Sequence, residues 1–411
     1  DAYDGVCCDA CCPAKLGPTD IQLAAFKRTK RTTMMDEVGP VPAPLETMRA
    51  AIVSKYINED GELEKDAIKI VAGKISKPNL RTVTGQWRRP LRRRRMLVRV
   101  LACSLSPRDA LAMTGDIAPI RSRIPYVPGT DICGVVEEVG VGVRDFMIGD
   151  IVVANTGRVP TGGLAEFVVV DADRVALKPE KVDPLSAAAC PSAGAAAVYA
   201  MDYVFEGDRV LVLGGGGGVG GSCVQLARIK GASYVASTSR QRTLVRRLGA
   251  DTVVNYMRED WWEKEEFVKD PFDVIIDCVG LPGSYDKSAN VLKMGHGGGR
   301  FVDIAGDSNR PPDISSWFRG LPPRGPRPNP LALCGSALPR YRRIQTTRLG
   351  DEIAMVLRLL RDEKLVVVLH NSGSFPFTTY GVQDAVRVVG SRHAHGKVVV
   401  AVCTDPRFYI N

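Results

Sequence analysis

A run of glycines in the middle of the chain constrains the fold more than any other feature. A short apolar run at 210–213 leads into these glycines, and a stretch with helical apolar spacing follows at 219–230. Gly215, Gly217 and Gly220 fit the pattern G-x-G-x-x-G, which marks a dinucleotide-binding turn when it joins a strand to a helix. The sequence therefore predicts a nucleotide-binding strand–turn–helix unit here.

Each glycine of this pattern has a physical purpose. One lets the chain turn sharply, one lets the backbone approach a pyrophosphate, and one lets the helix pack closely on the strand. The helix N-terminus then directs N–H groups and partial positive charge at the phosphates. A flexible linker is the alternative, but a second apolar run at 234–237 argues against it. The loop residues expected to bind the cofactor are Gly215, Gly217, Gly218, Val219 and Gly220.

Length and composition fit a soluble protein of two domains. The chain has 411 residues, of which 45% are hydrophobic and 25% charged, and it has a formal net charge of +9. It contains no apolar run long enough to span a membrane. The positive charge favours anionic partners such as nucleotides. The chain begins with Asp1 rather than Met, and a basic protein with a removed presequence suggests the mitochondrial matrix or, alternatively, a plastid.

The order of patterns along the chain predicts two folded domains after an extension. Residues 1–48 are the extension, and residues 49–182 show short β-runs separated by glycine and proline. Residues 183–365 alternate helix and strand, which implies a doubly wound parallel sheet. Residues 366–411 return to β-character and are expected to complete the first domain.

Eleven cysteines are present, and four of them lie close together in the extension. Cys7, Cys8, Cys11 and Cys12 form two overlapping C-x-x-C pairs. One short turn cannot easily direct four thiolates at one zinc ion, so a disulfide or unpaired thiols are favoured over a metal site. The other cysteines stand singly in apolar runs and are expected to be small buried side chains.

Three segments stand out as surfaces for protein partners: the extension 1–48, an arginine-rich loop at 88–95, and a Pro/Gly/Arg-rich segment at 306–343. A solvated turn is the simpler interpretation of the arginine loop. No aromatic interleaving accompanies it, so nucleic acid is not an expected partner.

Several further passages occur in a recognisable order: 96–109, 127–140 with its Pro-Gly-Thr-Asp, 162–167 with its Gly-Gly-Leu-Ala-Glu-Phe, 248–251 and 396–399. In these the chain resembles the medium-chain dehydrogenase/reductase superfamily, and within it the zinc-independent quinone oxidoreductase branch. Residues 341–345 and the extension look closest to the reticulon-interacting mitochondrial oxidoreductases. The resemblance implies an α/β protein with an irregular GroES-like β-domain and a Rossmann domain with a doubly wound parallel sheet.

The residue types at the two pocket motifs argue against a catalytic zinc. Zinc-dependent members need Cys, His and carboxylate ligands there. This chain has Ser104 and Ser106 in one motif and Thr130 and Asp131 in the other, and its histidines all lie in the C-terminal third. We therefore expect no metal.

The end of the second Rossmann strand indicates the cofactor. NAD enzymes place an acidic residue there to bind the ribose 2′-hydroxyl, whereas residues 237–242 read Ser-Thr-Ser-Arg-Gln-Arg. Two arginines can pair with a 2′-phosphate, so NADPH is expected rather than NADH. Solvent-facing arginines that merely begin a helix are the alternative. The expected cofactor-binding residues beyond the loop are Thr238, Ser239, Arg240, Arg242, Tyr256 and Lys397.

The resemblance implies hydride transfer from NADPH to a quinone or an activated alkene (enone). The pocket loop, however, has Ser106 where the family usually has Asn, and Leu111 where a Tyr often occurs. Ser106 remains a candidate hydrogen-bond donor to substrate, and Asp109 is expected to fix the loop. An accessory subunit of a larger membrane complex, which keeps the fold and the nucleotide, is the alternative function.

Overall fold

The structure is a computed structural model that describes residues 47–56, 67–78, 80, 94–115, 124–157, 162–294, 298–305, 340–343 and 349–408. The cysteine cluster, nearly all of the extension, residues 88–93 of the arginine loop and residues 306–339 lie outside the described residues, and so do the partner contacts expected of them. None of the helices in the described parts combines the length and the apolar character needed to cross a membrane.

A six-stranded parallel sheet forms the Rossmann half of the chain. Its strands are β8 (Arg209–Leu213), β9 (Tyr234–Thr238), β10 (Thr252–Val254), β11 (Val274–Asp277), β12 (Arg300–Asp303) and β13 (Arg340–Arg343). They stand in the order β10-β9-β8-β11-β12-β13. The first strand, β8, is central; β9 and β10 follow on one side of it, and the chain then crosses over to place β11, β12 and β13 on the other. In doubly wound sheets ligands bind where the order reverses, which here is the carboxyl end of β8. The predicted fold class is confirmed.

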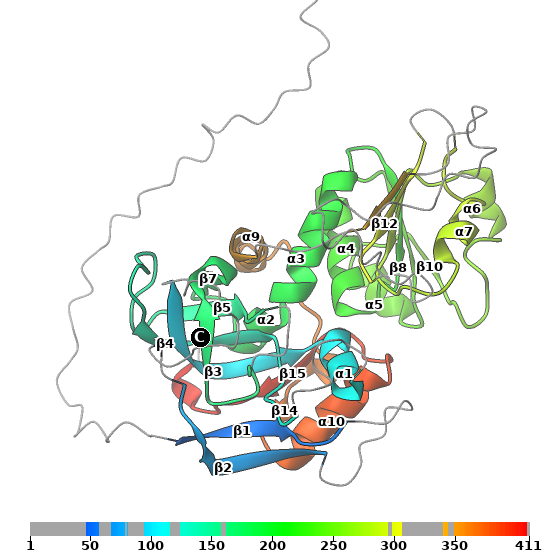
Figure 1. Cartoon of the computed structure of the whole chain (residues 1–411). Helices are drawn as coiled ribbons and strands as arrows, with labels where there is room; N and C mark the ends of the chain where they lie inside the picture. The colour runs from blue at the N-terminus through cyan, green and yellow to red at the C-terminus, as the bar shows by residue number, and fades with distance from the viewer. Residues whose placement is uncertain are drawn as a thin grey trace, which may run out of the picture. The chain divides into compact units, whose positions relative to one another are not determined.

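Strand β8 is buried on both faces, which explains its unbroken apolar sequence. Val210 and Val212 pack with Val224 of α4 (Gly218–Ile229), while Leu211 packs on the opposite face with Phe267. Figure 1 shows α3 (Pro191–Ala200) and α4 on one side of this sheet and α6 (Glu265–Lys269) and α7 (Ser284–Ser288) on the other. Each such side chain contributes about 1.5–3 kcal/mol when it is fully buried.

A second, mostly antiparallel sheet corresponds to the predicted β-domain. Its order is β14-β15-β3-β4-β5-β7, with β6 paired to β3 on the side. The C-terminal strand β15 runs antiparallel to β3, so the end of the chain returns to this sheet. The strands are β3 (Arg95–Leu105), β4 (Asp131–Val139), β5 (Ile151–Asn155), β6 (Phe167–Asp171), β7 (Val175–Leu177), β14 (Phe375–Pro376) and β15 (Val398–Ala401).

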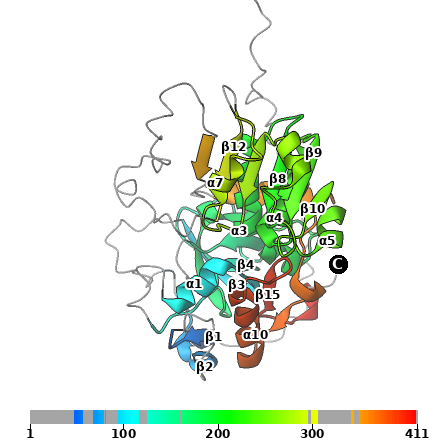
Figure 2. The ribbon, with the colours of Figure 1, turned by 90° about the vertical axis from the view of Figure 1, so that its right-hand side faces the viewer.

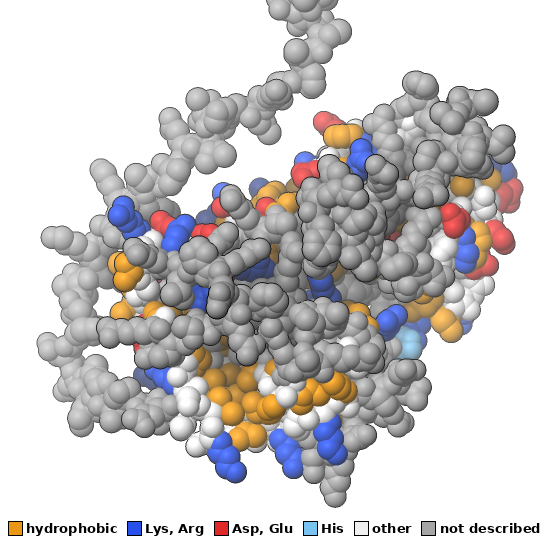
Figure 3. All heavy atoms as spheres, in the orientation of Figure 1, with side chains coloured by type: hydrophobic (Ala, Val, Ile, Leu, Met, Phe, Trp, Pro, Cys, Tyr) orange, Lys and Arg blue, Asp and Glu red, His pale blue; other side chains and the backbone are white. Residues whose placement is uncertain are grey.

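A separate two-stranded antiparallel sheet joins β1 (Thr47–Val53) and β2 (Ile68–Ser76). Ile70 and Ile75 of β2 are only partly buried, whereas Ile68 is fully buried. Figure 3 shows hydrophobic side chains gathered in this region of the molecule, with lysine and arginine side chains at its border.

The remaining helices cover the sheets and connect them. Helix α10 packs on β15, and α3 packs against both α4 and α9 (Figures 1 and 2). Asp183 caps α2 by accepting backbone N–H bonds from Leu185 and Ser186. The helices are α1 (Pro107–Thr114), α2 (Pro184–Ala189), α3 (Pro191–Ala200), α5 (Arg242–Arg247), α6 (Glu265–Lys269), α7 (Ser284–Ser288), α9 (Gly350–Arg361) and α10 (Thr379–Gly390).

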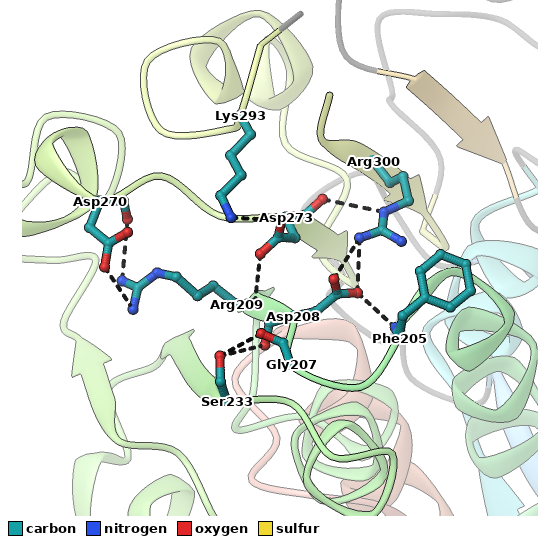
Figure 4. Close-up of polar contacts among 9 residues, drawn as sticks. All are labelled: Phe205, Gly207, Asp208, Arg209, Ser233, Asp270, Asp273, Lys293 and Arg300. Atoms are coloured by element: carbon teal, nitrogen blue, oxygen red, sulfur yellow. Dashed lines mark hydrogen bonds and ion pairs between the residues drawn. The ribbon is translucent and has the colours of Figure 1, made fainter. Parts of the chain in front are cut away.

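An ion-pair network closes the amino edge of the parallel sheet (Figure 4). Arg300 donates to both carboxylate oxygens of Asp208 at 2.9 Å, and Asp273 accepts the Arg209 backbone N–H at 2.9 Å. Lys293 pairs with the Asp273 carboxylate at 2.8 Å. The network links the first residues of β8 and β12 at the edge opposite to the glycine loop, so we assign it a structural role.

Arg94 and Arg95, the described end of the arginine loop, lie in ion pairs. Arg94 contacts Asp145 at 2.6 Å and Asp173 at 3.0 Å, and Arg95 contacts Asp171 at 3.1 Å. These two arginines therefore balance neighbouring carboxylates.

Candidate functional site

The glycine loop connects β8 to α4 in the predicted way. Gly217 is the N-cap of α4, and its N–H donates to the Gly214 carbonyl at 3.1 Å. The left-handed residue of the loop is Gly214, with φ +86°, which directly precedes Gly215, the first glycine of the pattern. The first helical turn begins at Gly218 and Val219, and its N-terminus is therefore placed at the carboxyl end of β8.

Steric crowding explains why two positions of the pattern must be glycine. A Cβ on Gly220 would lie 2.2 Å from the Gly214 carbonyl oxygen, and one on Gly215 would lie 2.2 Å from Ser237 Oγ. A Cβ on Gly217 would meet nothing closer than the Gly214 oxygen at 3.5 Å. Gly220 thus permits close packing of helix on strand, while Gly217 leaves an open approach to the backbone, which fits a pyrophosphate.

The end of β9 carries the residues expected to select the cofactor. Thr238 and Ser239 are buried, and their hydroxyls accept backbone N–H bonds from Gly214 and Gln241, both at 2.9 Å. These hydroxyls therefore fix the glycine loop and the following turn. Arg240 is exposed beside them.

Arg242, at the first position of α5, is also exposed. Among the described residues, the guanidinium groups of Arg240 and Arg242 make no hydrogen bond or ion pair. Both arginines can therefore receive an anion.

A histidine from the C-terminal segment joins this end of β9. His395 contacts Gln241 Nε2 at 2.8 Å and lies 5.8 Å, ring to ring, from His370. Burial, followed by the charges of His370, Arg240 and His393, lowers the pKa of His395 below its ordinary value. Sequence reasoning missed His395, because it lies far along the chain from β9.

Tyr256 follows β10 and is 46% exposed, so it remains a surface residue near the outer strands of the sheet.

Lys397, in contrast, lies directly against the glycine loop. The Gly396 N–H donates to the Gly216 carbonyl at 2.9 Å, and a Cβ on Gly218 would lie 2.5 Å from Lys397 Cδ. The Lys397 side chain is 8% exposed, and its ammonium lies 3.6 Å from Asp131. The structure therefore places Lys397 between the loop and the β-domain.

Asp131 is the centre of a buried polar network that sequence reasoning missed. Its Oδ1 accepts hydrogen bonds from Asn155 Nδ2 at 2.8 Å and Ser192 Oγ at 2.6 Å, and its Oδ2 accepts the Ser192 N–H at 3.2 Å. Asn155 lies at the end of β5, and Ser192 lies in the first turn of α3. The network thus joins the antiparallel sheet to the helices beside the glycine loop.

Ser106, the predicted pocket residue, is the N-cap of α1 and is partly buried. Its hydroxyl donates to Asp109 Oδ2 at 2.7 Å, and its backbone N–H donates to the same oxygen at 2.8 Å. Asp109 therefore fixes the loop as a capping residue.

A small hollow of about 10 Å³, room for about one water molecule, lies between α3, α4 and the segment that precedes β15. Gly217, Gly218, Cys190, Gln225 and Lys397 are among its lining residues. The hollow touches the glycine loop and α3 but does not reach the end of β9.

No group of three or more His, Cys, Asp or Glu side chains is placed to hold a metal ion within the described ranges. The predicted zinc-independent character stays a prediction.

Two family descriptions match separate parts of the chain. One is the alcohol dehydrogenase GroES-like domain, over residues 92–180, and the other is the zinc-binding dehydrogenase, over residues 248–400. The first range falls on the antiparallel sheet and the second on the later part of the parallel sheet and the C-terminal strands.

Individual proteins and structures give the same picture. The NADPH-dependent alkenal/one oxidoreductase of Arabidopsis thaliana, a chloroplastic protein, is 34% identical over 316 residues, covering 74% of this chain and 71% of that protein. The human mitochondrial NAD(P)H oxidoreductase RTN4IP1 is 35% identical over 206 residues, covering 45% of this chain and 52% of that protein. The solved quinone oxidoreductase of Coxiella burnetii has a TM-score of 0.69 and 26% identity, covering 87% of this chain and 100% of that one.

Proposed function

The chain belongs to the medium-chain dehydrogenase/reductase superfamily, and on that premise we propose that it is an NADPH-dependent oxidoreductase that reduces quinones or activated alkenes. One observation carries this proposal. A glycine-capped helix N-terminus at the carboxyl end of β8 stands beside a β9 end that has two exposed arginines and no acidic residue.

The residues present fit a phosphorylated nicotinamide cofactor. The open face at Gly217, with Gly218, Val219 and Gly220 in the first turn of α4, suits a pyrophosphate. Arg240 and Arg242 suit a 2′-phosphate, because guanidinium groups pair with phosphate oxygens. Thr238 and Ser239 hold the turn that presents them. NADPH, when bound, supplies a hydride from its nicotinamide ring.

The protein's own task is to bind and orient the acceptor. Ser106 presents a hydroxyl at the N-cap of α1, and we assign it the hydrogen bond to the acceptor oxygen. Lys397 and Asp131 keep the loop and the β-domain together beside it. A quinone needs little more, since water can protonate its reduced oxygens.

An organellar location fits the names of the relatives, one chloroplastic and another mitochondrial. We propose a mitochondrial location on the matrix side, with a plastid as the alternative. The accessory-subunit alternative depends on residues 1–48, 88–93 and 306–339, which lie outside the described residues. The described geometry favours the reductase.

The test is turnover by the purified protein. We expect NADPH to be consumed in the presence of a simple benzoquinone or a short α,β-unsaturated aldehyde, and more slowly when NADH replaces it. A protein that binds neither cofactor and consumes neither would contradict the proposal. Arg240→Ala should slow the turnover with NADPH, and Arg246→Ala, which removes another exposed arginine, in α5, is its matched control for effects of charge alone.

A further inference from the structure

The two oxygens of the Asp109 carboxyl have different surroundings. Oδ2 accepts hydrogen bonds from the hydroxyl and N–H of Ser106 and from Thr130 Oγ1 at 3.4 Å. Oδ1 is buried and has no hydrogen-bond partner among the described residues. Asp109 is only 1% exposed, although it lies in the first turn of a short helix.

The surroundings of Asp109 favour its protonated form. Burial is the main cause that raises the pKa of Asp109 to about 6; the hydrogen bonds from Ser106 oppose it, and the nearby charge of Asp131 adds to it. Lys397 acts in the opposite direction to Asp131. The other titratable groups that face Asp109 are Cys103 of β3 and Tyr126.

Neither of these neighbours, the Cys103 thiol or the Tyr126 phenol, ionises readily. Burial raises the pKa of the Cys103 thiol and that of the Tyr126 phenol well above their usual values, and the charge of Asp109 raises both further. The Tyr126 hydroxyl is also buried, without a hydrogen-bond partner in the described parts of the chain. Asp109 is therefore the group in this cluster that can hold and release a proton.

We propose that Ser106 and Asp109 act as the proton-donating pair of the site: Asp109 stores a proton, and Ser106 passes it to the carbonyl oxygen of an α,β-unsaturated aldehyde or ketone. This inference rests on the proposed function. In this proposal Ser106 is the catalytic residue, because its hydroxyl is the group assigned to the acceptor oxygen, and Asp109, which accepts that hydroxyl's hydrogen bond, is a positioning residue that acts through it. When Asp109 is ionised, the Ser106 hydroxyl donates to Oδ2. When Asp109 is protonated, Oδ2–H donates to Ser106 and leaves the Ser106 O–H available to the acceptor.

The reaction balances with these groups and water. A hydride, which carries two electrons, adds to the β-carbon of the unsaturated carbonyl compound, and the C=C electrons move to make an enolate. The enolate oxygen takes the Ser106 proton, Ser106 takes the Asp109 proton, and Asp109 is reprotonated from water. The enol then converts to the saturated carbonyl compound. The nicotinamide is oxidised, and the alkene is reduced.

A quinone provides an internal comparison, because water can protonate the reduced oxygens. We therefore expect the dependence on Asp109 with an unsaturated aldehyde and not with a benzoquinone. The experiment is a pH profile of kcat/KM for both substrates with the full chain, its Asp109→Asn, Ser106→Ala and Ser106→Thr variants, and Asp384→Asn as a control. Asp384 lies in an exposed ion pair on α10. Carboxyl ¹³C NMR of Asp109 gives a direct titration that does not depend on turnover.

For the aldehyde, we expect kcat/KM to be level below about pH 6 and to fall tenfold per pH unit above it, since the free enzyme's acid governs this constant. In Asp109→Asn, kcat/KM for the aldehyde at pH 6 should be about 100-fold lower, a loss typical of a removed general acid, and the fall of kcat/KM above pH 6 (the alkaline limb) should disappear. Ser106→Ala should behave in the same way, and Ser106→Thr should keep the limb. The NMR midpoint should lie near 6.

Several results would overturn the inference. One is a limb that persists in Asp109→Asn or occurs equally with the benzoquinone; another is an Asp109 midpoint of about 4, the ordinary value for an aspartate. Turnover of the benzoquinone together with either result would overturn this inference alone. Absence of turnover with both substrates would overturn the proposed function as well.

Discussion

The ammonium of Lys397 lies 3.6 Å from the carboxylate of Asp131, and both side chains are almost fully buried. Lys397 directly precedes β15, and its side chain packs against Gly218 of the glycine loop, whereas Asp131 is the first residue of β4. The pair therefore joins the nucleotide loop to the sheet that carries the pocket. A buried ion pair of this kind depends on its hydrogen bonds, which Asn155 and Ser192 supply to Asp131.

Replacing Lys397 should destabilise the protein. Lys397→Met keeps the stem that packs on Gly218 but leaves a buried carboxylate without its cation, so we expect a loss of about 3 kcal/mol in the free energy of unfolding. Urea unfolding measures this loss. The Asp131→Asn substitution should lower the free energy of unfolding by less in the Lys397→Met variant than in the wild type. Losses that simply add would contradict a coupled pair.

The glycine loop should not tolerate a methyl group at Gly220. Because a Cβ there would lie 2.2 Å from the Gly214 carbonyl oxygen, Gly220→Ala must push the helix from the strand. We expect at least roughly tenfold weaker NADPH binding and a loss of about 1–3 kcal/mol in stability. Gly390→Ala, at the end of α10 with nothing within 4 Å of its Cβ, is the control and should change neither. Equal behaviour of the two variants would show that the loop is not close-packed.

Arg240 should discriminate between the two nicotinamide cofactors. A charge-assisted hydrogen bond contributes about 1.5–3 kcal/mol, so Arg240→Ala should weaken NADPH binding by roughly 10- to 100-fold and leave NADH binding nearly unchanged. Fluorescence titration of both cofactors measures this difference, with Arg246→Ala beside it. Equal weakening of NADPH and NADH would argue that Arg240 does not contact the 2′-phosphate.

The network at the amino edge of the parallel sheet should make stability sensitive to acid. The pKa of Asp273 is lowered: burial opposes the shift, but the Arg209 N–H, Lys293 and Arg300 outweigh it. A lowered pKa in the folded state means that the stabilisation is present above the unfolded pKa, about 3.9, and is lost as pH falls through the folded value.

Asp273→Asn should therefore be less stable than the wild type at pH 7, and the gap should close below about pH 4. Thermal unfolding across this range measures the gap. A gap that stays constant with pH would assign the loss to packing rather than to charge.

Much of the fold could be predicted because its signals are local. The apolar run of β8, the glycines and the spacing of α4 define one unit within about twenty residues, and alternation of strand and helix defines the sheet. The crowding at Gly215 is different, because a Cβ there would meet Ser237 Oγ at 2.2 Å and Ser237 belongs to the neighbouring strand β9.

The site was predictable where its residues follow one strand and not where the fold brings distant segments together. Arg240 and Arg242 directly follow β9, so their place could be anticipated. Asn155, Ser192 and Lys397 meet at Asp131 from three separate elements, and His395 reaches Gln241 across 154 positions. Asn155 faces Asp131 across the pair of β4 and β5, and pairing of β15 with β3 brings the segment that carries Lys397 to the same sheet, so no local pattern in the chain encodes these contacts.

The most direct test of the central claim is a titration of the wild-type protein with NADPH and, in parallel, with NADH, followed by protein fluorescence. The account predicts saturable binding of both, with NADPH at least about tenfold tighter, because one charge-assisted contact to a 2′-phosphate contributes more than 1.4 kcal/mol. Binding of NADH as tight as that of NADPH, or no binding of either, would contradict it.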